Sequence, residues 1–526
     1  MLTQSSNPYL AQIQQTLPRL LALFDNDRSS QSYGMGDRYF WAWGLIDFGN
    51  GTFQGAAHGM ARLWRHGLWP YKTSKVHFIS RINSLFIAAS KLTRKDGSLE
   101  EAFPNEGSFC VTALVAFDLL CALDLLEADL DEATITSWQA VVQPMIAYLN
   151  KHDETHAIIS NHLATAVAAL VRWHRLTKDT VVEQRARQLL DRILTHQSSE
   201  GWLCEYEGAD PGYQSLCTYY LADVHQIRPD WKLLEPLRKS IQFLGNFAHP
   251  DGSFGGLYGS RCTRFYYPAG VLALANDIPE AVALADFMAN SIAKQTVVTL
   301  LAIDEPNLIP MFNAYCWAAV LAKETESACV ADVQLLPALN TQPLRQHYPQ
   351  AGLFIDRGER HYTIISTHKG GVVNHFVDGK LACHDGGLVL RSPKGRLGST
   401  QTYSPINRVA WLGDQQFVIE CNFTPMPKQL PGPWQFLALR LFCISVFHFA
   451  LLREFVKKQL VRLLITGAKS WPASNRRTIR LGVDLTVEDE SVLPGGYQRI
   501  SNIPTFVPIH MASQGYWQIQ DEQERV

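Results

Sequence analysis

Glu200-Gly-Trp-Leu203 belongs to a turn pattern that recurs through the first part of the chain and decides its fold. Similar turns are Asp96-Gly-Ser-Leu99, Glu106-Gly-Ser-Phe109 and Asp251-Gly-Ser-Phe254. Gly97 and Gly201 are 104 residues apart, and Gly201 and Gly252 are 51 apart, so the period is near 52. One copy lacks its glycine, in the region 149–160. A repeat of this length holds a helix pair that needs neighbours to bury its apolar faces.

The segments between these turns have the periodicity of helices. Apolar residues recur at spacings of three and four in 111–126, 135–149, 163–173 and 281–299. Repeated helix pairs can close into a toroid in which the N-termini of the inner helices gather at one mouth. These N-termini carry unpaired N–H groups and partial positive charge, so the mouth favours anions. We expect an incomplete (α/α) toroid over residues 1–326.

The pattern changes to short strands after residue 350. Segments that begin at residues 362, 371, 388, 416, 478 and 515 are rich in β-branched and aromatic residues, with Gly, Asp and Asn turns between them. This predicts an antiparallel β-sandwich over 351–526, joined to the toroid by a linker at 327–350. The predicted fold class is therefore α+β and multidomain.

One apolar helix is predicted to interrupt the sandwich over 434–466, with Pro433 at its start and Gly467 after its end. Arg440 and Arg453 enclose 12 uncharged residues, too few to span a bilayer. Two interpretations remain: a buried helix packed on the toroid, or an amphipathic helix on a membrane surface. In the second, the basic side chains at the headgroups are Lys457, Lys458 and Arg462.

Composition limits the partners and the compartment. The formal net charge of −2 gives no basic composition that would favour nucleic acid. The N-terminus has no basic segment followed by an apolar one, so we predict no signal peptide. The ten cysteines are scattered without a Cys-x-x-Cys pair and are expected to be reduced. We predict a cytoplasmic protein, with peripheral contact to the inner membrane through helix 434–466 as a further expectation.

Polar side chains stand at the predicted helix starts, and if the period is structural they all face the same mouth. The clusters are Glu106 with Ser108, Asn161 with His162, 206–220, and 258–267. Asn161 and His162 open the helical run ISNHLATAVAAL at 159–170, where Asn161 is either a helix cap or a substrate ligand. The candidate substrate-binding residues are Glu106, Glu207, Gln214, Arg261, Arg264 and Tyr267.

The chain resembles the heparinase II/III-like family over most of its length. The resemblance is carried by Asn161-His162 at a helix start, by Tyr219 on the next inner helix, and by the phrase LVRLLITG at 460–467. It implies a helical toroid followed by a β-sandwich, and a lyase that acts on a polysaccharide containing uronic acid. No cofactor is implied, although some relatives hold a structural divalent cation.

The implied chemistry is removal of the C5 proton of a uronic acid and β-elimination of the 4-O-linked sugar. The substrate carboxylate must be neutralised, a base must take the proton, and an acid must protonate the leaving oxygen. Asn161 and the arginines can bind the carboxylate. His162 can act as the base. Tyr219 is the first candidate for the second proton transfer, and Tyr213 is its rival.

The sequence also departs from the family. Many relatives have a Tyr-His pair where this chain has Tyr219-Tyr220, and many supply a second histidine from the β domain. The candidates for that histidine are His384 and His375, and either can equally be an ordinary strand or turn residue. His152 and His156 have a metal-ligand spacing but fall in a predicted turn, so we expect no catalytic metal.

Other functions remain open. A uronyl C5-epimerase needs the same base and the same carboxylate ligands as a lyase. A non-catalytic glycan-binding protein of polysaccharide biosynthesis would keep a cleft with aromatic residues that bind the sugar, without needing His162. A terpenoid-cyclase-like toroid is disfavoured because the chain has no Asp-Asp pair.

Overall fold

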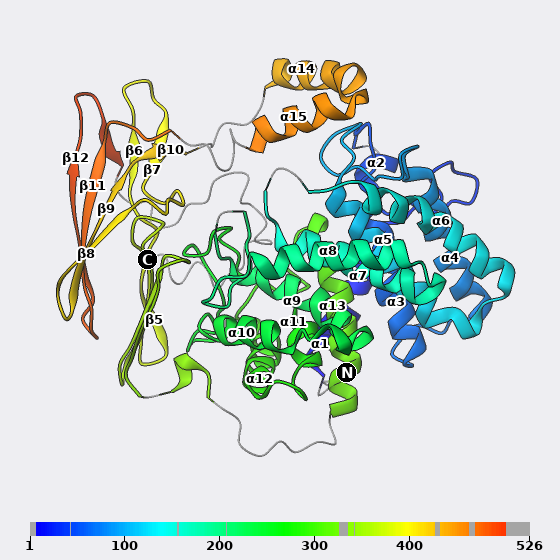
Figure 1. The fold of residues 1–526 in the computed structure, drawn as a ribbon, viewed down its shortest axis with the longest axis horizontal. Coiled ribbons are helices and arrows are strands. Elements are labelled where there is room, and N and C mark those ends of the chain that lie inside the picture. Colours follow the sequence, from blue (N-terminus) through cyan, green and yellow to red (C-terminus); the bar gives the residue numbers. More distant parts are fainter. Residues whose placement is uncertain are drawn as a thin grey trace.

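A computed structural model describes residues 7–42, 44–154, 157–206, 208–325, 335–340, 342–426, 432–461 and 469–500 (Figure 1). Helices make up the first part, and antiparallel strands dominate the second. The predicted order of a helical part followed by antiparallel sheets is confirmed. The change from helices to strands falls between residues 325 and 344, and the first strand lies inside the range predicted as the linker.

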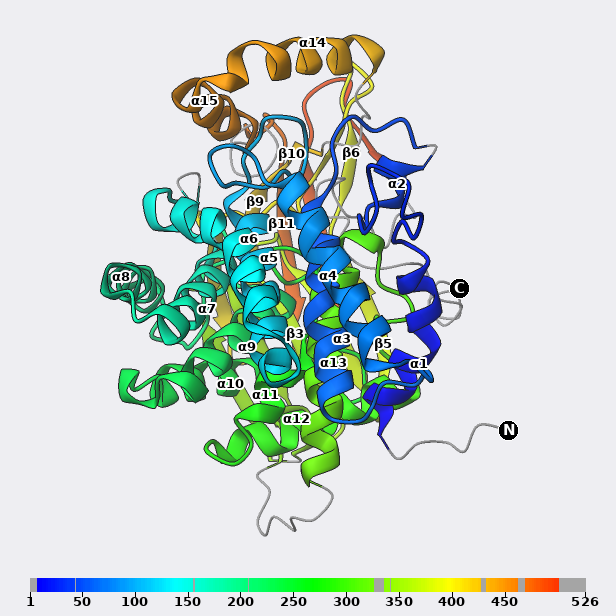
Figure 2. The ribbon, with the colours of Figure 1, turned by 90° about the vertical axis from the view of Figure 1, so that its right-hand side faces the viewer.

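Six inner helices contact one another in a cyclic order (Figure 2). They are α3 (Ala56–Arg65), α5 (Phe109–Leu126), α7 (Ser160–Thr177), α9 (Pro211–Ile227), α11 (Pro268–Ala273) and α13 (Glu305–Thr325). Each contacts the next, and α13 contacts α3 again. Helices α5, α7 and α9 begin at residues 109, 160 and 211, which is 51 residues apart in each case and agrees with the period of the turns.

Six further helices pack on the outside of this ring. They are α1 (Pro8–Leu21), α4 (Lys75–Leu92), α6 (Glu132–Lys151), α8 (Thr180–Thr195), α10 (Leu234–Gly245) and α12 (Pro279–Lys294). Helix α8 buries only Val182, Ala186, Leu189, Leu190 and Ile193, the stripe of an amphipathic helix. The short elements are α2 (Arg38–Trp41), η1 (Gly51–Gly55), η2 (Glu127–Asp129), η3 (Pro229–Trp231) and η4 (Pro337–Leu339).

The recurring glycines are required by the backbone of the turns. Gly97 and Gly201 have φ angles of +89° and +98°, in the left-handed region that glycine adopts without strain. A Cβ atom on Gly97 would lie 2.1 Å from the carbonyl oxygen of Pro144, and one on Gly201 would lie 2.4 Å from that of Lys239. Each turn therefore packs directly against the backbone of the next outer helix, which explains why the motif repeats with the fold.

The strands form three antiparallel sheets. The first has the order β1-β2-β3-β4-β5: β1 (Leu344–Tyr348), β2 (Leu353–Arg357), β3 (His361–Ser366), β4 (Val372–Val377) and β5 (Lys380–Asp385). The second has the order β12-β11-β9-β8: β8 (Arg408–Gly413), β9 (Gln416–Asn422), β11 (Ser474–Arg480) and β12 (Thr486–Val492). The third has the order β10-β7-β6-β13: β6 (Val389–Arg391), β7 (Leu397–Ser399), β10 (Thr424–Pro425) and β13 (Gln498–Ile500).

The first sheet is a middle layer: its central strands β2, β3 and β4 are buried on both faces, whereas the edge strands β1 and β5 are partly exposed. Leu353 and Ile355 of β2 belong to the large core that includes the helices, whereas Phe354 between them packs with Phe417 and Ile479 of the second sheet. This alternation follows from the two-residue period of a strand. The central strands of this sheet are therefore buried along almost their whole length and do not alternate buried with exposed residues.

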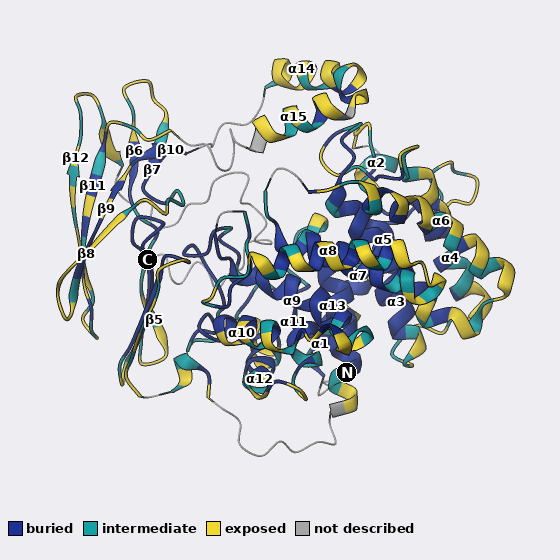
Figure 3. Cartoon of the chain, viewed as in Figure 1, coloured by how far each residue is buried: buried dark blue, intermediate teal, exposed yellow. Residues whose placement is uncertain are grey.

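The inserted segment forms two helices, not the single helix predicted over 434–466. Helix α14 (Pro433–Ile444) is followed by η5 (Val446–His448) and α15 (Ala450–Val461), and we call this unit the hairpin. The expectation that this segment is buried on the toroid is wrong, because most of its large apolar side chains are exposed (Figure 3). They include Trp434, Phe436, Leu437, Leu441, Ile444, Phe449, Leu451 and Phe455.

The hairpin touches the helical part through a few contacts. Cys443 and Phe447 are buried against Phe103. Lys457 lies 3.4 Å from a carboxylate oxygen of Glu106, so its predicted place at membrane headgroups is wrong. Arg462 lies outside the described residues.

Among the described helices, one is long and apolar enough to span a membrane. It covers Phe109–Asp129, and 78% of its most apolar window is buried inside the structure. That burial is typical of the central helix of a core.

Candidate functional site

Asn161 lies in the first turn of α7 and does not cap the helix. The N-cap residue is Ile159, which makes no side-chain capping bond. The Asn161 side chain is 4% exposed, and its Nδ2 donates to Oε2 of Glu205 at 2.7 Å. The interpretation of Asn161 as a helix cap is therefore wrong, and its role as a substrate ligand stays a prediction.

His162 is held by a carboxylate beside it. Its Nδ1 lies 2.8 Å from Oε2 of Glu154. Burial lowers the pKa of His162, but the Cys110 thiol and the Glu154 carboxylate beside the ring raise it well above its ordinary value. An imidazole with a raised pKa is protonated at neutral pH, which suits a proton donor or a cationic ligand better than a base.

Tyr213 lies in the first turn of the next inner helix, α9. Asp210 caps this helix by accepting the Tyr213 N–H at 3.2 Å, and Pro211 occupies the first helical position. The same Asp210 carboxylate accepts the backbone N–H of Arg261 at 2.9 Å. The Arg261 guanidinium lies over the rings of Tyr206 and Tyr213, with its Cζ 5.0 and 5.8 Å from their centroids. One carboxylate thus positions the tyrosine and the arginine together.

Arg261 retains hydrogen-bonding capacity that the described protein groups do not use. Its Nε lies 3.8 Å from Oε1 of Glu205, an ion pair without a hydrogen bond. Its Nε and Nη1 are buried and have no hydrogen-bond partner among the described residues. Buried donors are nearly always paired in folded proteins. The unused donors point to a ligand that supplies the oxygen atoms.

Glu205 links Asn161 and Arg261. Burial raises the pKa of Glu205 to about 7, although Arg261, His162 and the Asn161 amide act in the opposite direction. The chain around it is bridged to the start of α7, because Glu205 pairs with Ile159. Tyr206, the next residue, has a φ of +58°, which a non-glycine residue adopts only at a cost. Asn161, His162, Glu205, Tyr213 and Arg261 are called the mouth cluster below.

Three other candidates lie in the core. Tyr219, the first candidate for the second proton transfer, is only 1% exposed and packs against Phe117, Tyr220 and Trp317. Its ring contacts come from α5 and α13, which places Tyr219 inside the ring of helices. Gln214 is also buried, and it bonds to Ser240 and to the Leu203 N–H. Tyr267 is 1% exposed in the same core. None of these three can meet a substrate without a rearrangement.

The two predicted glutamates are not open ligands. Glu106 accepts the backbone N–H groups of Glu101 and Ala102, at 3.1 and 2.6 Å, and pairs with Lys457 of the hairpin. Its carboxylate is therefore used within the protein. Glu207 lies outside the described residues.

His384 and Arg264 lie near each other and near His249. Nδ1 of His384 lies 2.7 Å from the Asn374 side-chain oxygen, and its Nε2 is buried without a described hydrogen-bond partner. Burial, aided by Arg264 and His249, lowers the pKa of His384 to about 4. This histidine is neutral at physiological pH. His375 is buried in β4, where it bonds to Thr363 and to the Val483 carbonyl.

No metal centre is formed by the described residues. They contain no group of three or more His, Cys, Asp or Glu side chains placed to hold an ion. His152 stacks on Tyr148 with the ring centroids 4.1 Å apart, and His156 lies outside the described residues. The structural cation stays a prediction.

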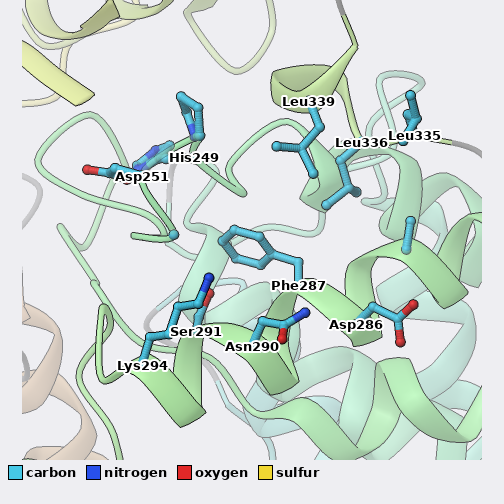
Figure 4. A pocket seen from close by; sticks show the side chains of 13 residues that line it. His249, Asp251, Asp286, Phe287, Asn290, Ser291, Lys294, Leu335, Leu336 and Leu339 are labelled. Atoms are coloured by element: carbon cyan, nitrogen blue, oxygen red, sulfur yellow. The ribbon is translucent and has the colours of Figure 1, made fainter. Parts of the chain in front are cut away.

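Two cavities lie away from the mouth cluster. The larger, of about 410 Å³, is lined by α12, by the turn at His249–Gly252 and by Leu335, Leu336 and Leu339 (Figure 4). The smaller, of about 200 Å³, lies between the later turns of α5 and α7 and includes Arg172. None of the predicted site residues lines either cavity.

The architecture, a ring of helix pairs followed by antiparallel sheets, is shared with enzymes of known structure. Chondroitin AC lyase from Streptomyces coelicolor A3, solved with chondroitin sulphate, matches 81% of this chain with a TM-score of 0.52 and 10% identity. The match covers 66% of that lyase, just under two thirds of its length. At this identity the likeness shows the fold alone.

Two weaker matches are a Paenibacillus xanthan lyase and a cellobiose 2-epimerase from Bacillus thermoamylovorans B4167. The xanthan lyase has a TM-score of 0.49 and 8% identity over 91% of this chain and 47% of its own. The epimerase has a TM-score of 0.44 and 11% identity over 60% of this chain and 98% of its own. No family model matches the chain, and no curated protein matches it. Membership of the heparinase II/III-like family stays a prediction.

Proposed function

We propose that this chain is an enzyme that acts on an acidic polysaccharide, removing the C5 proton of a uronic acid and eliminating the 4-O-linked sugar. The observation that carries the proposal is the mouth cluster, where an amide, an imidazole, a phenol and a guanidinium gather at the starts of α7 and α9. The fold likeness to a lyase solved with chondroitin sulphate gives additional support.

The substrate carboxylate is bound by Arg261 and Asn161. The buried Nε and Nη1 of Arg261 are two donors on different edges of the guanidinium, and each can bind an oxygen atom of the acidic sugar. Asn161 has a second N–H besides the one that Glu205 accepts. The N-terminus of α7 adds positive potential at the same place. Together these groups stabilise the negative charge that builds up when the C5 proton leaves.

Proton transfer is divided between two side chains. Tyr213 takes the C5 proton, since it is half-buried in the first turn of α9 and its ring lies beside the Arg261 guanidinium. His162, cationic beside Glu154, adds charge neutralisation and can protonate the leaving oxygen. This reverses the first assignment, in which His162 was the base and Tyr219 carried the second proton. Glu205 holds Asn161 and controls the charge next to Arg261.

The test is absorbance of the unsaturated product with chondroitin sulphate, alginate and polygalacturonate as substrates. We expect Asn161→Ala and His162→Ala each to lower the rate by about 100-fold. Tyr219→Phe, buried in the core, is the matched control and should keep the wild-type rate. A chain that produces no chromophore but exchanges the C5 hydrogen for deuterium is an epimerase. A chain that does neither with any uronate polymer contradicts the proposal.

The hairpin supports a second proposal, contact with a membrane surface from the cytoplasmic side. Most outward side chains of α14 are apolar, with Gln435 as a polar exception, and its one charged residue, Arg440, is paired with Asp47 at 2.8 Å. Both ribbon views place the hairpin at the edge of the molecule, where it can meet a flat surface (Figures 1 and 2). Lys457 joins it to Glu106 at the start of α5, so a bound membrane would lie near the mouth cluster.

Sedimentation with phosphatidylglycerol–phosphatidylethanolamine vesicles tests this contact. Wild-type protein should sediment with the vesicles, and the double variant Leu441→Ser, Leu451→Ser should stay in the supernatant. Val181→Ser, at an exposed apolar position on α8, is the matched control. If the wild-type protein remains in the supernatant at low salt, the membrane proposal fails while the proposed reaction is untouched.

A further inference from the structure

A buried lysine from the first sheet lies against a cysteine of the helical part. Lys369 lies in the turn between β3 and β4 and is 3% exposed. Its Nζ donates to the carbonyl oxygens of Leu257 and Gly259. The same Nζ lies 2.9 Å from Sγ of Cys262, which is 1% exposed. The amine and the thiol are therefore neighbours in a closed environment.

The surroundings of Lys369 are unusual for a buried ammonium group. Lysines are almost never fully buried unless a carboxylate pairs with them. In the described part of the chain, the polar partners of Nζ are two carbonyl oxygens and one sulfur, and no carboxylate forms an ion pair with it. The mouth cluster does not include this amine, so the proposed reaction leaves it without a role.

The contact also fixes the turn that carries Arg261. Cys262 is the next residue and has a φ of +59°, so the backbone of this turn is held in a left-handed conformation. The turn is closed by the bonds from Cys262 N to Gly259 O and from Gly256 N to Thr263 O. Lys369 binds two carbonyl groups of the same turn. A covalent link between the side chains of Lys369 and Cys262 would therefore join the sheet to the backbone that holds Arg261.

We propose that Cys262 and Lys369 form a covalent cross-link through one oxygen atom, Sγ–O–Nζ, when hydrogen peroxide is the oxidant. The separation of 2.9 Å is too long for a direct N–S bond and leaves room for one bridging atom. The inference depends on these contacts alone and not on the proposed reaction.

The cross-link needs two molecules of peroxide. In the first step the thiol sulfur is oxidised by two electrons to a sulfenic acid, the peroxide O–O bond breaks, and one water leaves. The lysine ammonium gives one proton to solvent. In the second step the nitrogen is oxidised by two electrons and bonds to the sulfenic oxygen, while the second peroxide leaves as two waters that carry one proton from nitrogen and one from the sulfenic O–H. One oxygen is gained and two hydrogens are lost in total.

Peptide mapping by mass spectrometry after peroxide treatment tests the proposal. We expect one linked species that contains Cys262 and Lys369, heavier than the two peptides by one oxygen minus two hydrogens, and separated again by dithiothreitol. The cross-link closes a chain segment from residue 262 to residue 369, so Tm should rise by about 2 °C or more on oxidation and fall back on reduction.

Three variants make the result specific. Cys262→Ser and Lys369→Met should each abolish both the linked species and the rise in Tm. Cys204→Ser, which removes a half-buried thiol elsewhere, should leave both unchanged. If Lys369→Met does not fold, the comparison of the wild type with Cys262→Ser decides whether the linked peptide contains Cys262. The proposal is overturned if treated wild-type protein shows only unlinked Cys262, whether reduced or carrying two or three oxygens.

Discussion

Two buried arginines of this protein are paired in opposite ways. Arg172 on α7 and Arg261 before α11 have side chains that are only 10% and 13% exposed. Arg172 binds both oxygens of Asp223 on α9, with Nε–Oδ2 at 3.0 Å, and Asp124 on α5 at 3.1 Å. The Arg261 guanidinium has one distant carboxylate at 3.8 Å, and two of its donors have no hydrogen-bond partner among the described residues.

The difference in pairing indicates that Arg172 stabilises the fold, whereas Arg261 has donors that a ligand can use. Arg172 fastens three inner helices together, since its partners come from α5 and α9. Arg261 lies at the helix starts, where the pairing is incomplete and the nearest carboxyl, Glu205, has a raised pKa. We infer that the saturated arginine acts on stability and the unsaturated one acts on substrate. Each prediction below tests one side of this contrast.

The largest effect is expected at the saturated pair. Asp223→Ala leaves Arg172 buried with only Asp124, and should lower the free energy of unfolding by about 4 kcal/mol. Denaturation by guanidinium chloride measures this change. Asp378→Ala, which removes an exposed partner of Arg360, should change stability little. Equal losses in the two variants would contradict the assigned role of Arg172.

The pH dependence of stability should report Glu205. Its pKa is about 7 in the folded state and about 4.5 in the unfolded state. The folded state therefore retains the proton of Glu205 more strongly than the unfolded state does. The protonated carboxyl contributes its full share to the free energy of unfolding below pH 4.5. This share declines as the pH rises to 7 and is absent above it. The difference is about 3 kcal/mol.

Glu205→Gln should remove this decline. Unfolding of the wild type and the variant at pH 5 and pH 8 gives the comparison. The wild type should lose more stability than the variant between the two values. Parallel losses would show that Glu205 does not titrate in this range.

Removing the unsaturated arginine should change the rate and not the fold. Arg261→Met should lower kcat/KM for the cleaved uronate polymer by about 100-fold, with a loss of stability smaller than that of Asp223→Ala. Arg261→Lys keeps the charge but loses the planar guanidinium with its separate Nε and Nη1 donors, and should recover only part of the rate. Steady-state absorbance assays and guanidinium unfolding separate the two effects. If Arg261→Met keeps the wild-type kcat/KM but lowers the free energy of unfolding as much as Asp223→Ala does, Arg261 stabilises the fold and does not act on the substrate.

The smallest effect is expected from a hydroxyl in the ring. The Tyr219 hydroxyl is buried without a described hydrogen-bond partner, so Tyr219→Phe should change stability by less than about 1 kcal/mol. It should leave the rate unchanged. Tyr213→Phe is the matched variant on the same helix and should lower the rate. If Tyr219→Phe abolishes turnover and Tyr213→Phe does not, the first assignment from the sequence was right.

Much of the architecture could be predicted from sequence because it depends on local backbone needs. Gly97 and Gly201 recur since their turns require left-handed backbone against a neighbouring helix. Two strands of the middle sheet, β3 and β4, were recognisable by their β-branched runs, whereas β1 falls in the range predicted as the linker and β2 and β5 were not singled out. The exposure of the hairpin could not be predicted, because an apolar helix has the same composition whether it is buried or not.

The candidate site was predicted only in part. Asn161 was found because it opens an inner helix, and Arg261 because it falls in a polar cluster of the same repeat. Asp210-Pro211 already marks the start of α9, a signal that favours Tyr213 over Tyr219 and was not given enough weight. Glu205 and Glu154 were missed because they act through tertiary contacts with α7, which no spacing in the sequence reveals.

The middle position of the first sheet has a consequence for how this chain can be divided. Leu353 and Ile355 face the helices, while Phe354 faces the outer sheet. Cutting the chain between residues 325 and 344 would expose two apolar surfaces to water, one on the helical fragment and one on the sheet fragment. Neither half is therefore expected to be produced alone in native form, and gene fusions or swaps at that point should yield aggregates.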